Sequence, residues 1–220
     1  MNETNYSELI ENLLPAFGET LEMCGIALLL AVLVGIPIGV LSYITSQGNI
    51  RQNKLVKLTV SLFINVILST PFVILLVLLL PFTKLVVGSS IGPEAASVPL
   101  GIVAIAFYAR LVEGNLHAVD KGVIEASVAM GATWFRIVTN VLLPGAFSGM
   151  IRGLTVLAVT LVGYSAMAGI VGGGGVGDLA IRFGYYRYQT DVMLITVVLL
   201  IILVQIIQTI GEKVSNKVQK

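Results

Sequence analysis

The uneven distribution of charged residues constrains this chain more than any other feature of its sequence. Four stretches carry no charge at all: 28 residues at 23–50, 26 at 58–83, 25 at 153–177 and 20 at 192–211. About 20 helical residues cross the roughly 30 Å hydrocarbon core of a bilayer, so each stretch is long enough to span a membrane. Only 11% of the 220 residues are charged and 56% are hydrophobic, which excludes a soluble globular domain and a disordered chain.

A fifth, shorter stretch has 15 uncharged residues, from 95 to 109. It spans only if Leu111 and Val112 are included and Arg110 snorkels or faces the protein interior. The stretches are apolar all round and lack the alternation of barrel strands. The sequence therefore predicts an all-α polytopic membrane protein, a single transmembrane domain over residues 1–220 with five transmembrane helices. We expect the helices at about 20–44, 58–81, 95–113, 146–171 and 190–211.

The basic residues predict how the helices are oriented. If the N-terminus lies outside, ten of the 13 Lys and Arg residues fall on the cytoplasmic side, in the 51–57 loop, the 110–152 region and the tail. Only Lys84, Arg182 and Arg187 then lie outside. Since cytoplasmic loops carry the excess of basic residues, the sequence predicts an N-out, C-in topology, which needs an odd number of spans.

The residue types needed for most catalytic chemistry are scarce in this chain. With only Cys24 and His117, there is no disulfide, no metal-ligand cluster and no Cys/His nucleophile pair. The 172–177 run, Gly-Gly-Gly-Gly-Val-Gly, fits G-x-G-x-x-G, but it lacks the preceding strand and the later acidic residue of a dinucleotide site. No Gly-Lys-Ser/Thr P-loop occurs, and the net charge of +1 gives no attraction to nucleic acid. We expect no catalytic residue, metal or cofactor in this chain, and a turn at the glycine run.

Polar residues occur inside the spans, but the centres of the spans carry no charge, which disfavours ion-coupled transport. These polar residues can line a path for a neutral or zwitterionic solute, or bond across helices. Met167 can seal such a path against its symmetry mate or simply pack, and the two residues before Pro71 can shape a kink instead of touching solute. The residues predicted for the translocation path or gate are Ser69, Thr70, Thr160, Tyr164, Ser165 and Met167.

The cytoplasmic segment at 114–144 is long for a polytopic protein of this size. Helix formers run from Asp120 to Met130, and Gly131 stands where a helix-ending left-handed residue is expected. Thr133 can cap a second short helix, which Pro144 interrupts or bends. Lys121 and Glu125, four residues apart, can stabilise the first helix. The product is two short helices at an angle. The first is rigid and has small side chains, so it is either a docking element or a connecting helix at the interface.

One motif in this segment resembles a known family. Glu125-Ala126-Ser127, then Gly131, then Val141-x-Leu143-Pro144 is similar in composition and spacing to the EAA motif of ABC importer permeases, with Ser127 for the second Ala and Val141 for the Ile. The five spans with N-out and C-in ends resemble methionine importer permeases, as do the segments 69–72, 81–83 and 161–167. The resemblance extends from about residue 15 to the tail.

The resemblance implies a multi-subunit machine in the bacterial plasma (inner) membrane. Members are homodimers with two cytoplasmic ATPase subunits, which bind the ATP and Mg, and an extracytoplasmic methionine-binding (lipo)protein. The implied substrates are L- and D-methionine and close analogues, and the coupling helix would dock the ATPase. The implied coupling residues are Glu125, Ala126, Ser127, Ala129, Gly131 and Ala132.

The outer segment 178–191 mixes aromatic and basic residues. Such residues are enriched in protein contacts, but aromatics also mark the membrane interface. The candidate residues for contact with a binding protein are Arg182, Tyr185, Tyr186 and Arg187. Two alternative functions remain open at this stage: a permease for another amino acid or small zwitterionic osmolyte, and a non-transporting scaffold that docks a cytoplasmic partner.

Overall fold

A computed structural model describes residues 6–49 and 51–218, with side chains from residue 11 onward. Every regular element in these ranges is helical, which confirms the predicted all-α class. Three elements are π-helical turns (η), and the others are α-helices. In chain order they are α1 (Tyr6–Leu30), η1 (Ala31–Gly35), α2 (Ile36–Thr45), α3 (Lys54–Ser69), α4 (Phe72–Val87), α5 (Pro93–His117), α6 (Lys121–Ala129), α7 (Trp134–Ile137), η2 (Val138–Leu142), α8 (Leu143–Gly169), α9 (Gly175–Leu179), η3 (Ala180–Tyr185) and α10 (Thr190–Val218).

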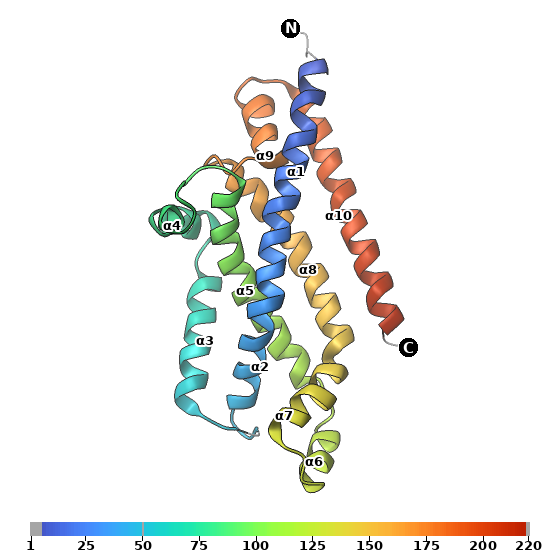
Figure 1. Cartoon of the computed structure of the whole chain (residues 1–220). Helices are drawn as coiled ribbons and strands as arrows, with labels where there is room; N and C mark the ends of the chain where they lie inside the picture. Colours follow the sequence, from blue (N-terminus) through green and yellow to red (C-terminus); the bar gives the residue numbers. More distant parts are fainter. Residues whose placement is uncertain (1–5, 50, 219–220) are drawn as a thin grey trace.

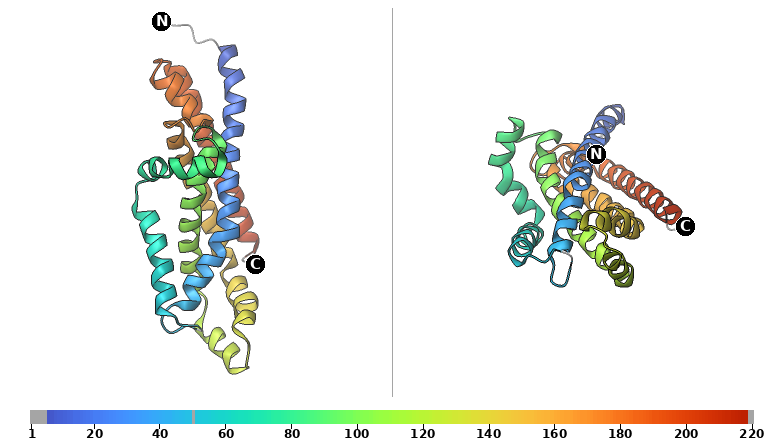
Figure 2. Two further views of the ribbon diagram at one scale, coloured as in Figure 1. Left: turned by 60° about the vertical axis from the view of Figure 1, so that its left-hand side comes forward. Right: turned by 60° about the horizontal axis from the view of Figure 1, so that its bottom comes forward.

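The shortest predicted span, α5, is the central helix of the bundle (Figures 1 and 2). Helices α1, α2, α3, α4 and α8 all pack on it. Of its apolar 18-residue segment, 67% is buried inside the protein. Two glycines of the first span allow a close approach, because a Cβ on Gly39 would lie 2.7 Å from the Ala109 carbonyl oxygen and one on Gly35 3.1 Å from that of Ile105. Small residues four apart are a common device for close helix packing in membranes.

The second predicted span, 58–81, is wrong as a single helix. The chain breaks at Thr70 and Pro71, and α3 and α4 meet at a bend of 112°. Proline disfavours the helical region for the residue before it, and Thr70 is extended, with φ −87° and ψ 125°. Figure 2 shows α4 lying across the bundle, while α3 runs along it. Among the described residues, four helices are long and apolar enough to cross a membrane, and the bent pair makes a fifth if counted as one span.

The fourth predicted span begins earlier than expected. The helix runs without a break from Trp134 to Gly169, so the prediction that Pro144 interrupts a separate short helix is wrong. The backbone passes through the π-helical turn η2 immediately before Pro144, which sits in the first turn of α8. Such a turn changes the hydrogen-bond pattern locally, so that a residue without an N–H is accommodated.

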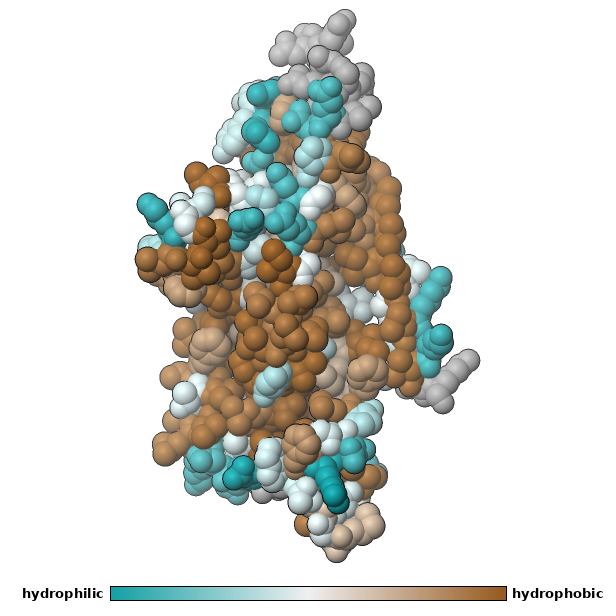
Figure 3. Space-filling view, viewed as in Figure 1, coloured by the Kyte–Doolittle hydropathy of each residue, from teal (hydrophilic) through white to brown (hydrophobic). Residues whose placement is uncertain are grey.

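The surface has an apolar belt between two hydrophilic ends (Figure 3). Helix α10 contributes strongly to this belt, because only 11% of its apolar 18-residue segment is buried. The N-terminal end of α1 and α9 lie at one end of the molecule, and α6 and α7 lie at the other (Figure 1). We call these the α9 end and the α6 end. The fold thus places the predicted coupling segment and the predicted outer segment on opposite sides of the apolar belt.

Candidate functional site

The helix α6 projects from its end of the molecule with both of its termini closed by local hydrogen bonds (Figure 1). The Asp120 carboxylate accepts a hydrogen bond from the Gly122 N–H at 2.7 Å, as an N-cap does. At the other terminus Gly131 has φ +78°, and its N–H donates to the Val128 carbonyl at 2.9 Å. The predicted helix, its start and its left-handed glycine are confirmed.

The predicted coupling residues divide between two faces of α6. Glu125, Ala126, Ala129 and Gly131 are exposed. Ser127 is buried and donates to the Val123 carbonyl at 2.7 Å, and Ala132 packs against the core. The expected pairing of Lys121 with Glu125 is wrong, since no ion pair joins these two described residues. Four of the six residues are therefore on the surface, and the other two, Ser127 and Ala132, are covered by other parts of the chain.

Large apolar side chains surround the exposed face of this helix. We name Val123, Val128, Met130 and Phe135 the apolar patch, and they are 51–81% exposed. Exposed apolar groups clustered at a polar end typically mark a protein contact. Thr133 stands at the N-cap position of α7, as predicted, but its side chain makes no capping hydrogen bond.

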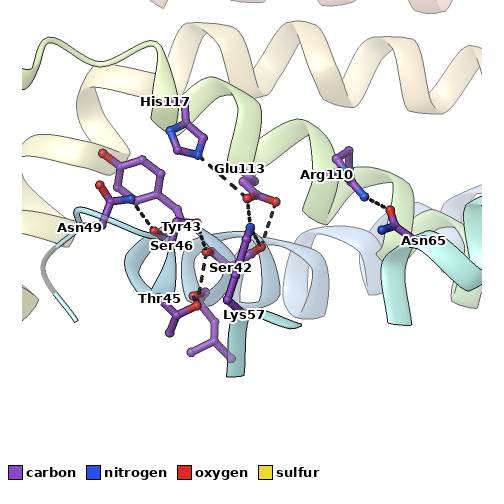
Figure 4. A network of polar contacts seen from close by, with 11 residues as sticks. Ser42, Tyr43, Thr45, Ser46, Asn49, Lys57, Asn65, Arg110, Glu113 and His117 are labelled. Atoms are coloured by element: carbon purple, nitrogen blue, oxygen red, sulfur yellow. Dashed lines mark hydrogen bonds and ion pairs between the residues drawn. The ribbon is translucent and has the colours of Figure 1, made fainter. Parts of the chain in front are cut away.

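A buried polar network ties the helices α2, α3 and α5 together (Figure 4). Glu113 of α5 is 8% exposed; its carboxylate pairs with the Lys57 ammonium of α3 and accepts a hydrogen bond from the Ser42 hydroxyl of α2 at 2.9 Å. Lys57 also donates to Ser42 at 2.8 Å. We call these three residues the polar lock. Sequence reasoning missed it, although an acidic residue within an apolar helix is itself a functional signal.

The polar lock continues to the last residue of α5. The His117 Nε2 lies 4.0 Å from the Glu113 carboxylate, and its ring meets Tyr43 edge to face at 4.8 Å. Only three residues separate His117 from α6. Helix α6 therefore follows the helix that carries Glu113 after a short connection.

Helix α8 has one face that is largely exposed. Arg152, Val156, Gly163 and Met167 are exposed along it and Thr160 is partly buried, at helical spacings of three or four residues. We call this set the open face of α8. Two predicted path residues, Thr160 and Met167, lie on it, and Met167 is 41% exposed.

The other predicted path residues lie elsewhere. Tyr164 stacks on Phe72 at the start of α4, with ring centroids 4.5 Å apart and planes 6° apart. Ser165 is 2% exposed, donates to the Val162 carbonyl at 2.8 Å and lies beside Cys24 of α1, away from the open face. Ser69 and Thr70 lie at the break between α3 and α4, where Thr70 donates to the Val66 carbonyl at 2.8 Å. The structure thus brings Tyr164 close to the broken span and buries Ser165.

The glycine run forms the predicted turn at the α9 end. Gly172, Gly174 and Gly175 all have positive φ. The turn is seated on α1, because Gly175 donates its N–H to the Glu19 carboxylate at 2.7 Å and Val176 donates to Thr20 Oγ1 at 3.0 Å. These side chains occupy the backbone N–H groups that a phosphate would need.

The predicted binding-protein residues are exposed at the same end. Arg182 pairs with Asp178 at 2.8 Å, and burial raises the pKa of the Asp178 carboxyl despite this cation. Arg187 lies over the Phe183 ring at 4.4 Å. Tyr185 and Tyr186 meet edge to face at 5.4 Å and are 65% and 68% exposed, so a broad aromatic surface faces outward.

Comparisons with known proteins give a consistent picture. The sequence model described as "Binding-protein-dependent transport system inner membrane component" matches residues 35–218. The probable D-methionine transport system permease protein MetI of Vibrio cholerae is 47% identical over 206 residues, covering 94% of this chain and 92% of that protein. The methionine import system permease protein MetP of Bacillus subtilis is 45% identical over 180 residues, covering 82% and 81%. A solved structure of the MetNI methionine ABC transporter in an inward-facing conformation matches with a TM-score of 0.95, 44% identity and full coverage of both chains.

Proposed function

The chain belongs to the family of binding-protein-dependent transport system inner membrane components, and we propose that it is the permease subunit of an ATP-driven methionine importer. The observation that carries this is the likeness to methionine permeases over nearly the whole length of both proteins. The chain is a transport component of the bacterial inner membrane, and nucleotide binding belongs to its partner ATPase.

The working assembly contains two copies of this chain, two cytoplasmic ATPase subunits and an extracytoplasmic binding protein. Counted with the bent pair as one span, the chain crosses the membrane five times, with its N-terminus outside and its C-terminus inside. The basic-residue distribution supports this orientation, because the α6 end carries most of the Lys and Arg residues. Five helices enclose little volume, so the path lies between the two copies.

Helix α6 couples the permease to ATP hydrolysis by seating in a groove of the ATPase. Its small exposed residues Ala126, Ala129 and Gly131 let the groove approach, Glu125 offers a charge, and the apolar patch supplies contact area. Ser127 is buried and Ala132 packs against the core, so this side of the segment faces the rest of the chain. When the two ATPase subunits close, they move the two α6 helices together as rigid bodies.

The polar lock transmits this motion into the bundle. Glu113 is four residues from the end of α5, and its contacts reach Ser42 of α2 and Lys57 of α3. A shift of α6 therefore moves three helices together at this end. Because α7, η2 and α8 form one continuous helix, the same shift also reaches the open face of α8.

Met167 on the open face is the proposed gate. It is flexible, polarisable and 41% exposed, so it can pack against the same residue of the second copy and seal the path. Thr160 lies on the same face, toward the α6 end, and lines the proposed path. The stack of Tyr164 on Phe72 fixes the broken span against α8, which keeps Ser69 and Thr70 near the gate. The residues Arg182, Tyr185, Tyr186 and Arg187 form the docking surface for the binding protein.

Radiolabelled methionine uptake tests the assignment. The chain is reconstituted in vesicles with its ATPase and binding protein, and uptake is measured with and without ATP. Competition by unlabelled D-methionine and by other amino acids then ranks the substrates. Uptake of another amino acid or an osmolyte in preference to methionine contradicts the substrate assignment. If ATP drives no uptake of any of these solutes, the chain is a scaffold and the transport assignment is contradicted.

A further inference from the structure

We propose that a polar cavity between α8 and α10 is a transit site that binds the α-ammonium and α-carboxylate groups of the amino acid after it passes the gate. This inference rests on the proposed function and names a site for it. The cavity has a volume of about 610 Å³, within the range of small-molecule sites. Its polar lining includes Thr160 and Arg152 of α8 with Gln208, Glu212 and Asn216 of α10.

The two charged residues come from opposite walls of the cavity and carry opposite signs. Arg152 projects from α8 and Glu212 from α10, and both side chains are exposed. A zwitterion carries one positive and one negative group, so a cavity with one charge of each sign can offer an opposite charge to both groups. A guanidinium binds a carboxylate well because of its planar set of N–H donors, and a carboxylate accepts from an ammonium.

The guanidinium is held in position at the cavity wall. Arg152 Nε donates to Ser215 Oγ of α10 at 3.0 Å, and Ser215 Oγ also lies 3.2 Å from the Ser148 hydroxyl of α8. Ser215 is fully buried. A charged group anchored by a buried hydroxyl is preorganised, which lowers the entropic cost of binding a ligand.

The cavity lies on the path that the gate would open. Arg152, Val156 and Thr160 belong to the open face of α8, which also carries Met167. Thr160 is seven residues from Met167 toward the α6 end, or about 10 Å along the helix. A solute released past Met167 toward the cytoplasm therefore meets the cavity next.

The lining also indicates that the site does not recognise the side chain of the amino acid. Its apolar wall is made of Val156 and Val159, which provide contact for an aliphatic or thioether side chain but no specific hydrogen bond. The polar groups are placed for the backbone charges that all α-amino acids share. The site therefore recognises the zwitterion, and side-chain selection falls to the binding protein.

Cysteine protection tests the site without relying on uptake. Asn216→Cys is introduced with Cys24→Ala, because Cys24 is the single native cysteine. The permease–ATPase complex in lipid nanodiscs, without nucleotide, is treated with a small methanethiosulfonate reagent, and the reaction rate is measured against L-methionine concentration. We expect the rate to fall about tenfold at ten times the Kd. Methioninol, which lacks the carboxylate, and 4-(methylthio)butanoate, which lacks the ammonium, should not protect.

Two further variants and one control decide the outcome. Arg152→Gln and Glu212→Gln, each combined with Asn216→Cys, should abolish protection by methionine. Gln47→Cys, exposed in the loop after α2, should react at a rate that methionine does not change. Protection that survives both charge substitutions, or appears equally at Gln47→Cys, overturns the transit site. Absent protection together with normal methionine uptake overturns the site alone, whereas protection without ATP-driven uptake overturns the importer assignment.

Discussion

Removal of the Glu113 carboxylate from the polar lock should destabilise this bundle, because the Lys57 ammonium then loses its ion-pair partner. Glu113→Ala removes a carboxylate that is 8% exposed and leaves the Lys57 ammonium with the Ser42 hydroxyl at 2.8 Å. Removing one partner of a fully buried ion pair costs about 3–5 kcal/mol, whereas exposed pairs contribute about 0–1 kcal/mol. The Lys57 side chain is 28% exposed, so we expect a loss of about 2–3 kcal/mol in unfolding free energy.

A double-mutant cycle built from the singles Lys57→Met and Glu113→Leu and their combination separates the pair from its surroundings. Glu113→Leu, like Glu113→Ala, leaves the Lys57 ammonium without its carboxylate partner. Lys57→Met alone leaves a buried carboxylate with only Ser42 and the half-exposed His117 nearby, and it should cost about as much as Glu113→Ala. The double variant Lys57→Met/Glu113→Leu leaves no uncompensated charge. We expect it to lie within about 1 kcal/mol of the natural protein, because apolar packing can replace a buried ion pair.

Equilibrium unfolding in mixed micelles measures these differences. The fraction of SDS is raised, and helix loss is followed by circular dichroism for each variant. Glu125→Ala is the matched control, since this carboxylate is exposed and makes no ion pair with a described residue; its change should stay within about 0.5 kcal/mol. A Glu113→Ala change as small as the control, or a double variant that costs the sum of the two singles, refutes the reasoning.

Three further predictions concern other positions. Gly131→Arg should abolish uptake with normal membrane insertion, because it adds bulk to the docking face, while Gly131→Asn, which tolerates positive φ, should retain most uptake. Met167→Ala should raise basal ATP turnover in reconstituted vesicles. Unchanged turnover shows that Met167 only packs against its neighbours and is not the gate. Gly39→Ala should lower unfolding free energy by about 1–3 kcal/mol because its Cβ meets the α5 backbone. Gly25→Ala, with open space around its Cβ, should cost nothing, and equal losses contradict the packing argument.

The break between α3 and α4 shows where sequence reasoning reaches its limit. The 58–83 stretch carries no charge and is mostly apolar, so hydropathy detects it but carries no information about where the chain changes direction. Pro71 did not settle the question, because Pro81 and Pro99 lie inside continuous helices. The bend forms where Phe72 stacks on Tyr164 of α8, a contact across 92 residues of sequence. Tertiary packing therefore decides which proline ends a helix.

The coupling helix could be predicted closely because its signals are local. Asp120 and Gly131 act through hydrogen bonds to their own neighbours, and these bonds form as the sequence indicated. The division of the coupling residues into an exposed set and a covered set was not predictable. Ser127 is buried, and α6 packs against α7 and η2, a tertiary contact that no local pattern encodes.

Composition and charge spacing were enough to identify a helical membrane protein and its uncharged stretches, and short-range hydrogen bonds were enough to locate α6. Packing between helices was needed to show that Met167 faces outward while Ser165 faces α1, that Lys57 meets Glu113, and that Arg152 and Glu212 share one cavity. The reason is physical: an apolar helix has no preferred face until neighbouring helices cover part of it, and charges distant in sequence become partners only through packing.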